Sequence, residues 1–337
     1  MQRAIDIAAW GAGYEKSNPL VGAVLVWNDE IIGEGYHQKF GTAHAEVNAI
    51  NDALKKHPEK IREATIYISL EPCFHFGKTP PCVDLLLKHE IKKVLIANID
   101  PHIKVANKSI AKLEASGVEV HVGLLADEAS FLNRRFFTVH QKQRPFVILK
   151  WAESVDGFLA PKPATRLQLS NAQVASMNQT WRAQEMAIMV GTNTAEIDNP
   201  QLSNRSGWGD SPIRIVIDRN GRLSPKLNIF DGSQETIVFT SLNKENKSNL
   251  EFVQIDFEQA VVPQILFVLY EKQIKSLIVE GGAMLLQSFI ELDCWDEIRQ
   301  IKTNSILKKG LTAPKVNAGL RFTQQIGNNT IRIYNPI

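Results

Sequence analysis

The sequence predicts an α/β protein built of two domains. Its 337 residues exceed the usual size of a single domain. Strand-like and helical patterns alternate along both halves, which is typical of a sheet covered by helices. All eight histidines lie at or before position 140, so the two halves must carry different chemistry. The polar stretch 141–145 ends in proline and separates them, and we expect domains at 1–143 and 144–337.

Turn and cap residues delimit the elements of the first half. Asn28-Asp29-Glu30 separates two apolar runs and predicts a hairpin. Pro58 stops one helical pattern, and Pro80-Pro81 opens another because proline suits a first helical turn. The predicted helices are 2–11, 44–56, 82–90 and 108–116, and the predicted strands are 21–27, 31–36, 65–70, 93–98 and 118–122.

The second half repeats this alternation without an internal sequence repeat. Short runs rich in β-branched residues predict strands, and longer stretches with helical spacing of apolar residues predict helices. The predicted strands are 146–151, 186–190, 213–218, 236–240 and 276–279, and the predicted helices are 171–184, 258–272 and 283–292.

Composition excludes several classes of protein. The net charge is +2 and is evenly spread, which argues against a nucleic-acid-binding surface. No apolar run approaches the length of a membrane helix, and the N-terminus lacks the apolar core of a signal peptide. Three cysteines do not make a disulfide framework in a chain of this length. We therefore expect a cytoplasmic protein without nucleic-acid or membrane partners.

A histidine and two cysteines in the first half predict a catalytic zinc site. His44, Cys73 and Cys82 would supply three ligands and leave a fourth position for water. Glu46, two residues after the histidine, would move a proton without binding the metal. One alternative is a closed structural site, with His75 as the fourth ligand. A second is a pair of ordinary buried thiols with no metal.

Four segments of the first half then resemble a known family. They are Asn-Pro-Leu-Val-Gly-Ala-Val at 18–24, Gly-Glu-Gly-Tyr-His at 33–37, His-Ala-Glu-Val-Asn-Ala at 44–49 and Glu-Pro-Cys-Phe-His-Phe-Gly-Lys-Thr-Pro-Pro-Cys at 71–82. The half is similar to the deaminase domain of the bifunctional riboflavin-biosynthesis deaminase/reductase. The resemblance implies a cytidine-deaminase-like three-layer α/β/α fold. It also implies hydrolytic deamination of diaminohydroxyphosphoribosylaminopyrimidine.

The resemblance assigns roles to individual side chains of the first half. His44, Cys73 and Cys82 would bind zinc, and Glu46 would be the proton shuttle. Substrate contacts would come from Asn18, His37, His75, Lys78 and Asp100. A lysine in a Gly/Thr loop also suits a phosphorylated substrate. The sequence departs from the family pattern at Asp100-Pro101-His102, at 105–109 and at 12–17.

Two glycine junctions mark the second half. Val190-Gly191-Thr192 and Glu280-Gly281-Gly282 each follow a strand, where backbone N–H groups can face a phosphate. As a general dinucleotide signal both are weak. Together with Lys-Trp-Ala-Glu-Ser-Val-Asp-Gly at 150–157 and Asp-Asn-Pro-Gln-Leu-Ser-Asn-Arg at 198–205, they resemble the family's reductase domain. That resemblance implies a dihydrofolate-reductase-like fold and NADPH-dependent reduction of the ribosyl group to ribityl.

The reductase resemblance also assigns roles. Proton handling would fall to Asp198, Lys150 and Glu280. Substrate binding would involve Arg182, Leu202 and Arg205, because arginine holds a phosphate with paired donors. Arg219 is a candidate for the extra ribose phosphate of NADPH. The cofactor-binding set would be Ala152, Ser154, Ser170, Gly191, Thr192, Thr194, Asp218, Gly281 and Gly282.

Departures and alternatives remain for the second half. Leu169-Ser170-Asn171 and Lys302-Thr303-Asn304 differ from the family pattern. One alternative is a zinc deaminase of another base or nucleotide with a non-catalytic second domain. Another is a non-catalytic zinc module that scaffolds a partner or binds nucleic acid. The resemblance further implies a homo-oligomer, a dimer or a tetramer.

Overall fold

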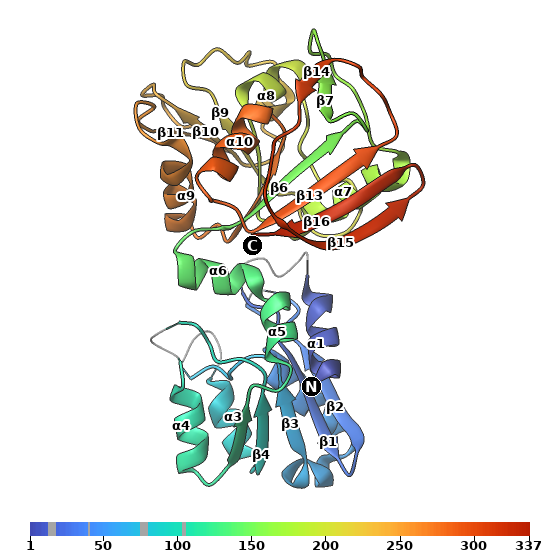
Figure 1. The fold of residues 1–337 in the computed structure, drawn as a ribbon. Helices are drawn as coiled ribbons and strands as arrows, with labels where there is room; N and C mark the ends of the chain where they lie inside the picture. The colour runs from blue at the N-terminus through green and yellow to red at the C-terminus, as the bar shows by residue number, and fades with distance from the viewer. Residues whose placement is uncertain (13–17, 40, 75–79, 103–105) are drawn as a thin grey trace. The chain divides into compact units, whose positions relative to one another are not determined.

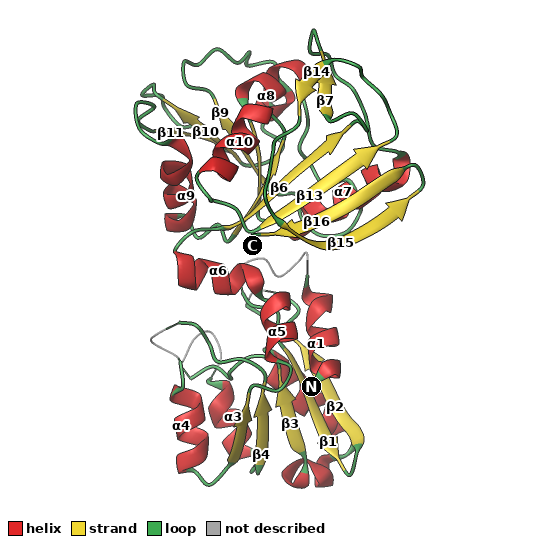
Figure 2. Ribbon diagram, in the orientation of Figure 1, coloured by secondary structure: helices red, strands yellow, loops and turns green. Residues whose placement is uncertain are grey.

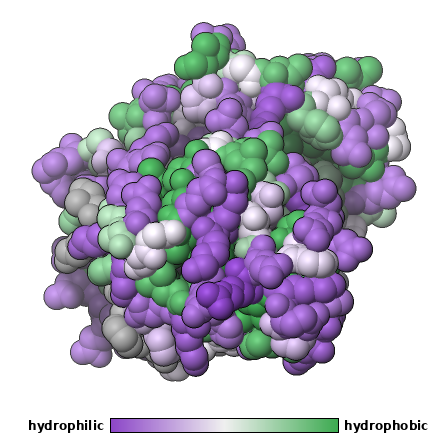
Figure 3. Space-filling view, turned by 90° about the horizontal axis from the view of Figure 1, so that it is seen from below, coloured by the Kyte–Doolittle hydropathy of each residue, from purple (hydrophilic) through white to green (hydrophobic). Residues whose placement is uncertain are grey.

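A computed structural model describes residues 1–12, 18–39, 41–74, 80–102 and 106–337. The chain divides into two compact units, Met1–Lys142 and Gln143–Ile337. Both units are α/β, as Figures 1 and 2 show. Hydrophilic residues dominate the face seen in Figure 3, with hydrophobic areas between them. None of the helices within the described ranges combines the length and hydropathy that a bilayer span requires.

The first unit is built on a five-stranded mixed sheet in the order β2-β1-β3-β4-β5. Strand β1 is antiparallel to β2 and β3, whereas β3, β4 and β5 run parallel. The strands are β1 (Gly22–Trp27), β2 (Glu30–Tyr36), β3 (Thr65–Ile68), β4 (Lys93–Ile96) and β5 (Glu119–Val122).

Helices cover both faces of this sheet, which gives the expected three layers. One face packs against α2 (Ala45–Lys56), α3 (Cys82–Lys88) and α4 (Lys108–Ala115). The other face packs against α1 (Gln2–Ala8) and α5 (Ala126–Leu132). Helix α6 (Arg134–Lys142) ends the unit. The helix predicted at 2–11 finishes as a 3₁₀ turn, Ala9–Gly11, and 58–63 forms a further 3₁₀ segment.

Two glycines let α2 approach β2 unusually closely. A Cβ atom on Gly33 would lie 2.5 Å from the Ala49 carbonyl oxygen, and one on Gly35 would lie 2.4 Å from the Ala49 nitrogen. Any larger residue would push the helix away from the strand. Since α2 carries His44 and Glu46 at its start, this contact fixes the position of the zinc site.

The second unit contains a nine-stranded sheet in the order β11-β10-β9-β8-β12-β6-β13-β16-β15. The strands from β11 to β13 run parallel, and β16 is antiparallel to both β13 and β15. A separate pair joins β7 (Phe158–Pro161) to β14 (Gly310–Thr312). The main strands are β6 (Phe146–Glu153), β8 (Ala187–Val190), β9 (Ile213–Ile217), β10 (Thr236–Thr240), β11 (Leu250–Gln254), β12 (Ser276–Glu280), β13 (Glu297–Thr303), β15 (Gly319–Ile326) and β16 (Asn329–Asn335).

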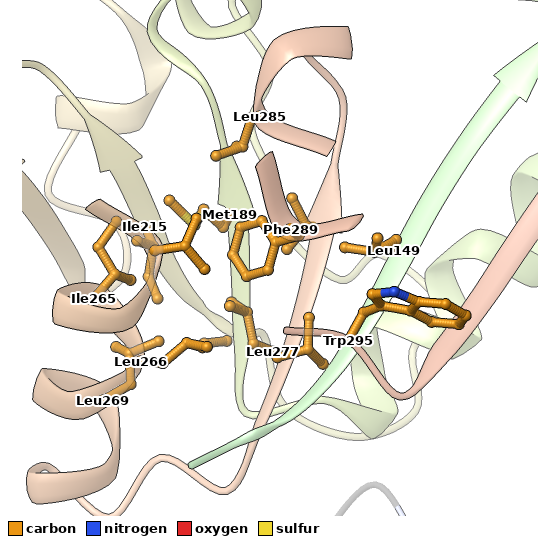
Figure 4. Packing of buried hydrophobic residues seen from close by; sticks show 14 of the residues in the cluster. Leu149, Met189, Ile215, Ile265, Leu266, Leu269, Leu277, Leu285, Phe289 and Trp295 are labelled. Atoms are coloured by element: carbon orange, nitrogen blue, oxygen red, sulfur yellow. The ribbon is translucent and has the colours of Figure 1, made fainter. Parts of the chain in front are cut away.

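Helices α7 (Ala172–Gln184) and α8 (Thr192–Asp198) pack on one face of this sheet, and α9 (Val261–Glu271) and α10 (Ala283–Glu291) pack on the other. Figure 4 shows Phe289 of α10 lying beside Met189 and Leu149 of the sheet, with Leu266 of α9 to one side. The carboxyl ends of β8 and β12 lead into α8 and α10, so both glycine junctions fall at the same edge of the sheet. Ligands of open parallel sheets bind at this edge.

Candidate active sites

Three side chains with zinc-ligand chemistry meet at the start of two helices in the first unit. His44 is the N-cap residue of α2, Cys82 opens α3, and Cys73 lies in the loop after β3. The His44 Nδ1 atom lies 3.2 Å from the Cys82 sulfur and 3.5 Å from the Cys73 sulfur. All three ligand atoms lie within 4.8 Å of one another. One imidazole and two thiolates fit Zn²⁺ and leave one tetrahedral position open.

The alternative of a closed zinc site depends on a residue outside the described part of the chain. His75 falls there, as does Lys78, so the predicted contacts of both stay predictions. Among the described residues, the candidate ligand group contains His44, Cys73 and Cys82 and no fourth histidine, cysteine or carboxylate.

The two cysteines differ in how readily they lose a proton. A hydrogen bond from the Cys82 thiol lowers the pKa of Cys73 to about 4. The backbone N–H of Cys82 donates a second hydrogen bond to the same sulfur at 3.2 Å. The pKa of Cys82 is raised. The main cause is the hydrogen bond between its thiol and Cys73, and burial adds to the rise. The loop therefore favours a thiolate at Cys73, which is the form that binds a metal.

Glu46 lies buried in the first turn of α2 and is 3% exposed. Burial raises the pKa of its carboxyl group to about 6, and the charge of Cys73 adds to that rise. General acid–base catalysis is most efficient when the pKa lies near the working pH. The carboxyl group is thus next to the ligands and able to exchange a proton in neutral solution.

His37 orients Asn18 beside the ligands. Its Nδ1 atom lies 3.1 Å from the Ala43 carbonyl oxygen, which can only accept, so this nitrogen carries the proton. The Nε2 atom then accepts from the Asn18 amide nitrogen at 3.2 Å. The imidazole ring also packs edge-on against His44, with 5.4 Å between ring centres. This geometry gives His37 an orienting part in addition to any contact with substrate.

Glu71 is a buried carboxylate that the sequence reasoning missed. Its Oε2 atom accepts from the backbone N–H groups of Asp100 at 3.2 Å and Asn107 at 3.0 Å, and its Oε1 atom accepts from the Ser109 hydroxyl at 2.7 Å. Because Cys73 follows two residues later, Glu71 links the ligand loop to the backbone at Asp100. The signal was available, since an acidic residue between a buried strand and Pro72-Cys73 is unusual.

A cavity of about 930 Å³ opens in the second unit at the edge formed by the two glycine junctions. This size suits a dinucleotide with a small substrate, since drug-sized ligands occupy pockets of roughly 300–1,000 Å³. Most of the predicted reductase residues line it. They are Lys150, Ala152, Arg182, Gly191, Thr192, Thr194, Asp198, Leu202, Glu280, Gly281 and Gly282.

Gly281 and Gly282 line this cavity with backbone atoms alone. Gly281 and Gly282 have φ values of +92° and +81°, which side chains rarely adopt. Their nearest neighbour across the cavity wall is Thr194, at 3.3 to 3.5 Å from the position that a Cβ atom would take. Thr192 donates to the Ile217 carbonyl oxygen at 2.6 Å and so secures the start of α8. This backbone lining fits the predicted nucleotide cofactor, because bare backbone can approach a phosphate closely.

Glu280 is held as an anion by two cations inside the cavity. Arg182 donates to both of its oxygens, at 3.0 and 2.7 Å, and the Lys150 Nζ atom lies 3.7 Å from Oε2. Burial would raise the pKa of Glu280, but the charges of Arg182 and Lys150 outweigh it and lower the pKa to about 2. Burial lowers the pKa of Lys150, and Glu280 partly opposes that shift. The pairing favours an anchoring part for Glu280 over proton donation.

We expect Arg182→Met to destabilise the second unit by about 3–5 kcal/mol, because it leaves a buried carboxylate without its main partner. In the unaltered protein, the folded pKa of Glu280, about 2, lies below the ordinary 4.5. Its stabilising contribution is therefore present above pH 4.5 and lost as the pH falls toward 2. In the variant the pKa of Glu280 rises, so the deficit should shrink as the pH falls below neutrality.

Urea denaturation followed by tryptophan fluorescence between pH 5 and 8 measures this effect. The double substitution Arg182→Met with Glu280→Gln removes the charge as well and should recover most of the loss. Equal stability of Arg182→Met and the unaltered protein at pH 8 would contradict the pairing.

The pKa of Asp198 is shifted in the opposite direction to that of Glu280. It ends α8, lines the cavity and is half-buried. Burial raises the pKa of its carboxyl group, and Arg166 only partly opposes the shift. A carboxyl group with a raised pKa carries a proton more often near neutrality, which is what a proton donor needs. Asp198 and Lys150 are thus the better proton donors of the three predicted residues.

Five predicted residues of the reductase site lie outside the cavity lining. Ser154 donates to Asp156 and Asp218 accepts from the Arg222 and Leu223 backbone, so both side chains stabilise turns. The remaining three contact neighbouring residues of the protein. Arg205 donates to Gln201, and Arg219 forms an ion pair with Glu258. The Ser170 carbonyl oxygen accepts from Gln168. Their predicted contacts with ligands stay predictions.

Arg222 lines the cavity where Arg219 was expected to do so. It pairs with Glu196 at 3.3 Å and donates to Asn193, another lining residue that was missed. Both arginines flank the same turn, Asn220-Gly221, so spacing alone could not tell which of them faces the cavity.

Comparisons with known proteins match each of the two units to a described family. A family model of the cytidine and deoxycytidylate deaminase zinc-binding region matches residues 1–98, and a model of the RibD C-terminal domain matches residues 145–306. The riboflavin biosynthesis protein RibD of Bacillus amyloliquefaciens is 36% identical over 331 residues, covering 96% of this chain and 88% of that protein. RibD of Aquifex aeolicus is 36% identical, covering 93% and 88%.

Solved structures of similar proteins belong to the same family. A diaminohydroxyphosphoribosylaminopyrimidine deaminase/5-amino-6-(5-phosphoribosylamino)uracil reductase of Thermotoga maritima has a TM-score of 0.92 at 35% identity, covering 100% of this chain and 97% of that one. RibD of Acinetobacter baumannii has a TM-score of 0.91 at 30% identity, with the same coverage. The chain therefore belongs to the RibD family of riboflavin-biosynthesis proteins and is a bifunctional enzyme, a zinc-dependent deaminase joined to an NADPH-dependent reductase.

Proposed function

We propose that residues 1–143 deaminate diaminohydroxyphosphoribosylaminopyrimidine and that residues 144–337 reduce the resulting 5-amino-6-(5-phosphoribosylamino)uracil. Both compounds appear in the description of the similar Thermotoga maritima enzyme. The observation that carries the proposal is the meeting of His44, Cys73 and Cys82 beside the buried carboxyl group of Glu46. The substrate is in either case a small pyrimidine, and its phosphate is part of the proposal.

In the deamination step, Glu46 accepts a proton from the attacking water and passes it to the departing amino group. The oxygen of the water bonds to the ring carbon, the bond from that carbon to nitrogen breaks, and ammonia leaves. A zinc ion held by the three ligands supplies acidity to that water. Asn18, oriented by His37, and Asp100 hold the pyrimidine, and His75 and Lys78 complete the predicted contacts.

In the reduction step, Asp198 or Lys150 donates a proton while a hydride reaches the sugar carbon. NADPH, when bound along Gly281 and Gly282, supplies that hydride. The hydride and the proton together open the ribosyl group to ribityl. Glu280 keeps Lys150 and Arg182 in place as a permanent anion, and the excess positive charge of this group favours a phosphorylated substrate.

Incubation with the diaminopyrimidine tests both halves in one experiment. Without NADPH, mass spectrometry should find the deaminated ribosylaminouracil and ammonia. With NADPH, it should find a product two mass units heavier than this intermediate. Deamination without any oxidation of NADPH would favour instead a deaminase with a non-catalytic second domain.

Loss of one ligand should separate zinc binding from reduction. We expect Cys82→Ser to bind far less zinc than the unaltered chain and to lose deamination, because the serine hydroxyl does not ionise near neutral pH as a thiol does at a metal. Elemental analysis of the purified protein measures the zinc. The matched control is Cys294→Ser, a free cysteine of the second unit, which should keep its zinc. Full zinc content in Cys82→Ser would contradict the assigned ligand set.

A homo-oligomer and a cytoplasmic location are the remaining parts of the proposal. Strand β15 is one of the two outer strands of the nine-stranded sheet, and it exposes Leu320 and Phe322. Exposed apolar side chains on an edge strand suit pairing with another copy of the chain. The free cysteines of the described residues suit a reducing compartment.

A further inference from the structure

A buried arginine lies behind the wall of the reductase cavity. Arg214 of β9 is 1% exposed. Because side chains alternate along a strand, it shares the sheet face of Val216, which packs in the same cluster as Leu202 of the cavity lining. A charged group so deep in an apolar layer is rare unless its donors are all directed at partners.

The guanidinium group of Arg214 binds two parts of the chain at once. Its Nε atom donates to the Gln201 carbonyl oxygen at 2.8 Å. Its Nη1 atom donates to the Asn228 carbonyl oxygen at 3.0 Å and to the Asp231 carboxylate at 2.6 Å, and its Nη2 atom donates to the Ser233 hydroxyl at 3.1 Å. Arg214 thus ties the segment after α8 to the segment 228–233.

Asn228 extends this hold to the residue that follows Asp198. Its backbone N–H donates to the Asn199 side-chain oxygen at 2.7 Å, and its side-chain amide donates to the Asn199 carbonyl oxygen at 2.7 Å. Arg214 therefore hydrogen-bonds the segment 199–202 directly at Gln201, and it contacts Asn199 indirectly through Asn228.

The backbone of this segment needs such support. Asn199 and Leu202 have φ values of +39° and +53°, in the left-handed region that a leucine side chain disfavours. Conformations of this kind persist only where surrounding contacts determine them, and they gather at functional sites. Asp198, which directly precedes the segment, and Leu202, at its end, both line the cavity.

We propose that Arg214 is a positioning residue for the reduction step, which holds the segment 199–202 so that Asp198 and Leu202 face the substrate. The inference rests on the proposed function, with Asp198 rather than Lys150 as the proton donor. Arginine suits the position because its planar group directs donors to several acceptors at once, whereas the single ammonium group of lysine cannot span them.

Arg214→Lys tests this positioning while it keeps the charge. The kcat of reduction should fall roughly 10-fold to 100-fold, because small displacements of a catalytic group cost rates of this order, while KM for NADPH changes by less than about twofold. The kcat of deamination should stay unchanged. Asn228→Ala removes the side-chain amide that donates to the Asn199 carbonyl oxygen, while the backbone N–H bond to Asn199 remains. It should slow reduction in the same way but less, so it decides the question if Arg214→Lys does not accumulate as folded protein.

Arg144→Lys is the matched control for lost stability. Arg144 makes a paired contact with Asp296 in the same unit, at 2.5 and 2.9 Å, and does not line the cavity. Its replacement should lower thermal stability and leave the kcat of reduction unchanged. Equal slowing of reduction by Arg144→Lys and Arg214→Lys would overturn the inference.

A double substitution shows whether Arg214 acts through Asp198. Arg214→Lys should slow reduction far less in the Asp198→Asn background than in the unaltered protein, because an absent carboxyl group cannot be misplaced and only the position of Leu202 still changes. Multiplying effects would overturn the inference. Slow reduction by Asp198→Asn, with unchanged reduction by Arg214→Lys and by Asn228→Ala, would overturn this inference alone. Full reduction by Asp198→Asn would assign the proton to Lys150 and also overturn this inference, whereas a lack of NADPH oxidation by the unaltered protein would overturn the proposed function.

Discussion

Replacing Glu46 with glutamine should lower the rate of deamination by roughly 10²–10⁴-fold and leave reduction unchanged. Glutamine matches the shape of the buried side chain but cannot accept and return a proton. Since the residue is not a member of the ligand group, the variant should keep its zinc. Ammonia release from the diaminopyrimidine measures the loss, and NADPH oxidation with supplied ribosylaminouracil measures the activity that remains.

Glu59→Gln provides the comparison for this substitution. Glu59 is an exposed carboxylate of the same unit, so its replacement removes the same charge without touching the site. It should deaminate at the normal rate. If Glu46→Gln deaminated as fast as Glu59→Gln, the proton shuttle would have to be another group.

Asp198→Asn should produce the reverse pattern. We expect reduction to fall by roughly 10²–10⁴-fold, as is usual when a general acid is removed, with deamination intact. The raised pKa of Asp198 leads us to expect that the unaltered enzyme loses reductase activity as the pH rises, because the carboxyl group then loses its proton. The variant should lack this limb of the pH profile.

Glu196→Gln is the control for Asp198→Asn. Glu196 lies on the same helix, α8, and is exposed. Glu196 forms an ion pair with Arg222, so the substitution also shows whether that arginine needs its partner. Rapid reduction by Asp198→Asn would transfer the role of acid to Lys150, which the structure places in the same cavity.

Local sequence patterns predicted the elements whose burial follows hydrophobicity. Strand β8 is a wholly buried apolar run, and β10 is a wholly buried run of three apolar residues between two threonines. Asn171 caps α7 by accepting from the Val174 N–H, as an asparagine before a helix suggests. The grouping of His44, Cys73 and Cys82 was predictable too, because metal chemistry allows few residue types and two of the three lie at helix starts.

Elements whose burial depends on partners far along the chain could not be predicted. In β13, Glu297 and Arg299 are both buried, and Arg299 donates a hydrogen bond to Glu297. Charged residues are usually exposed, so the sequence of this strand does not look like that of a buried strand. Strand β15 is exposed along nearly its whole length and forms only by pairing with β16. The pairing of Glu280 with Arg182 joins residues 98 positions apart, and no local pattern could show that it makes Glu280 an anion.

The seating of α2 against β2 has an evolutionary consequence. Gly33 and Gly35 each carry a hydrogen atom where any other residue would place carbon within 2.5 Å of the Ala49 backbone. Selection should therefore remove substitutions at these two positions, although both glycines are buried and neither belongs to the candidate ligand group. The positions of His44 and Glu46 in the first unit thus depend on two glycines that carry no reactive side chain.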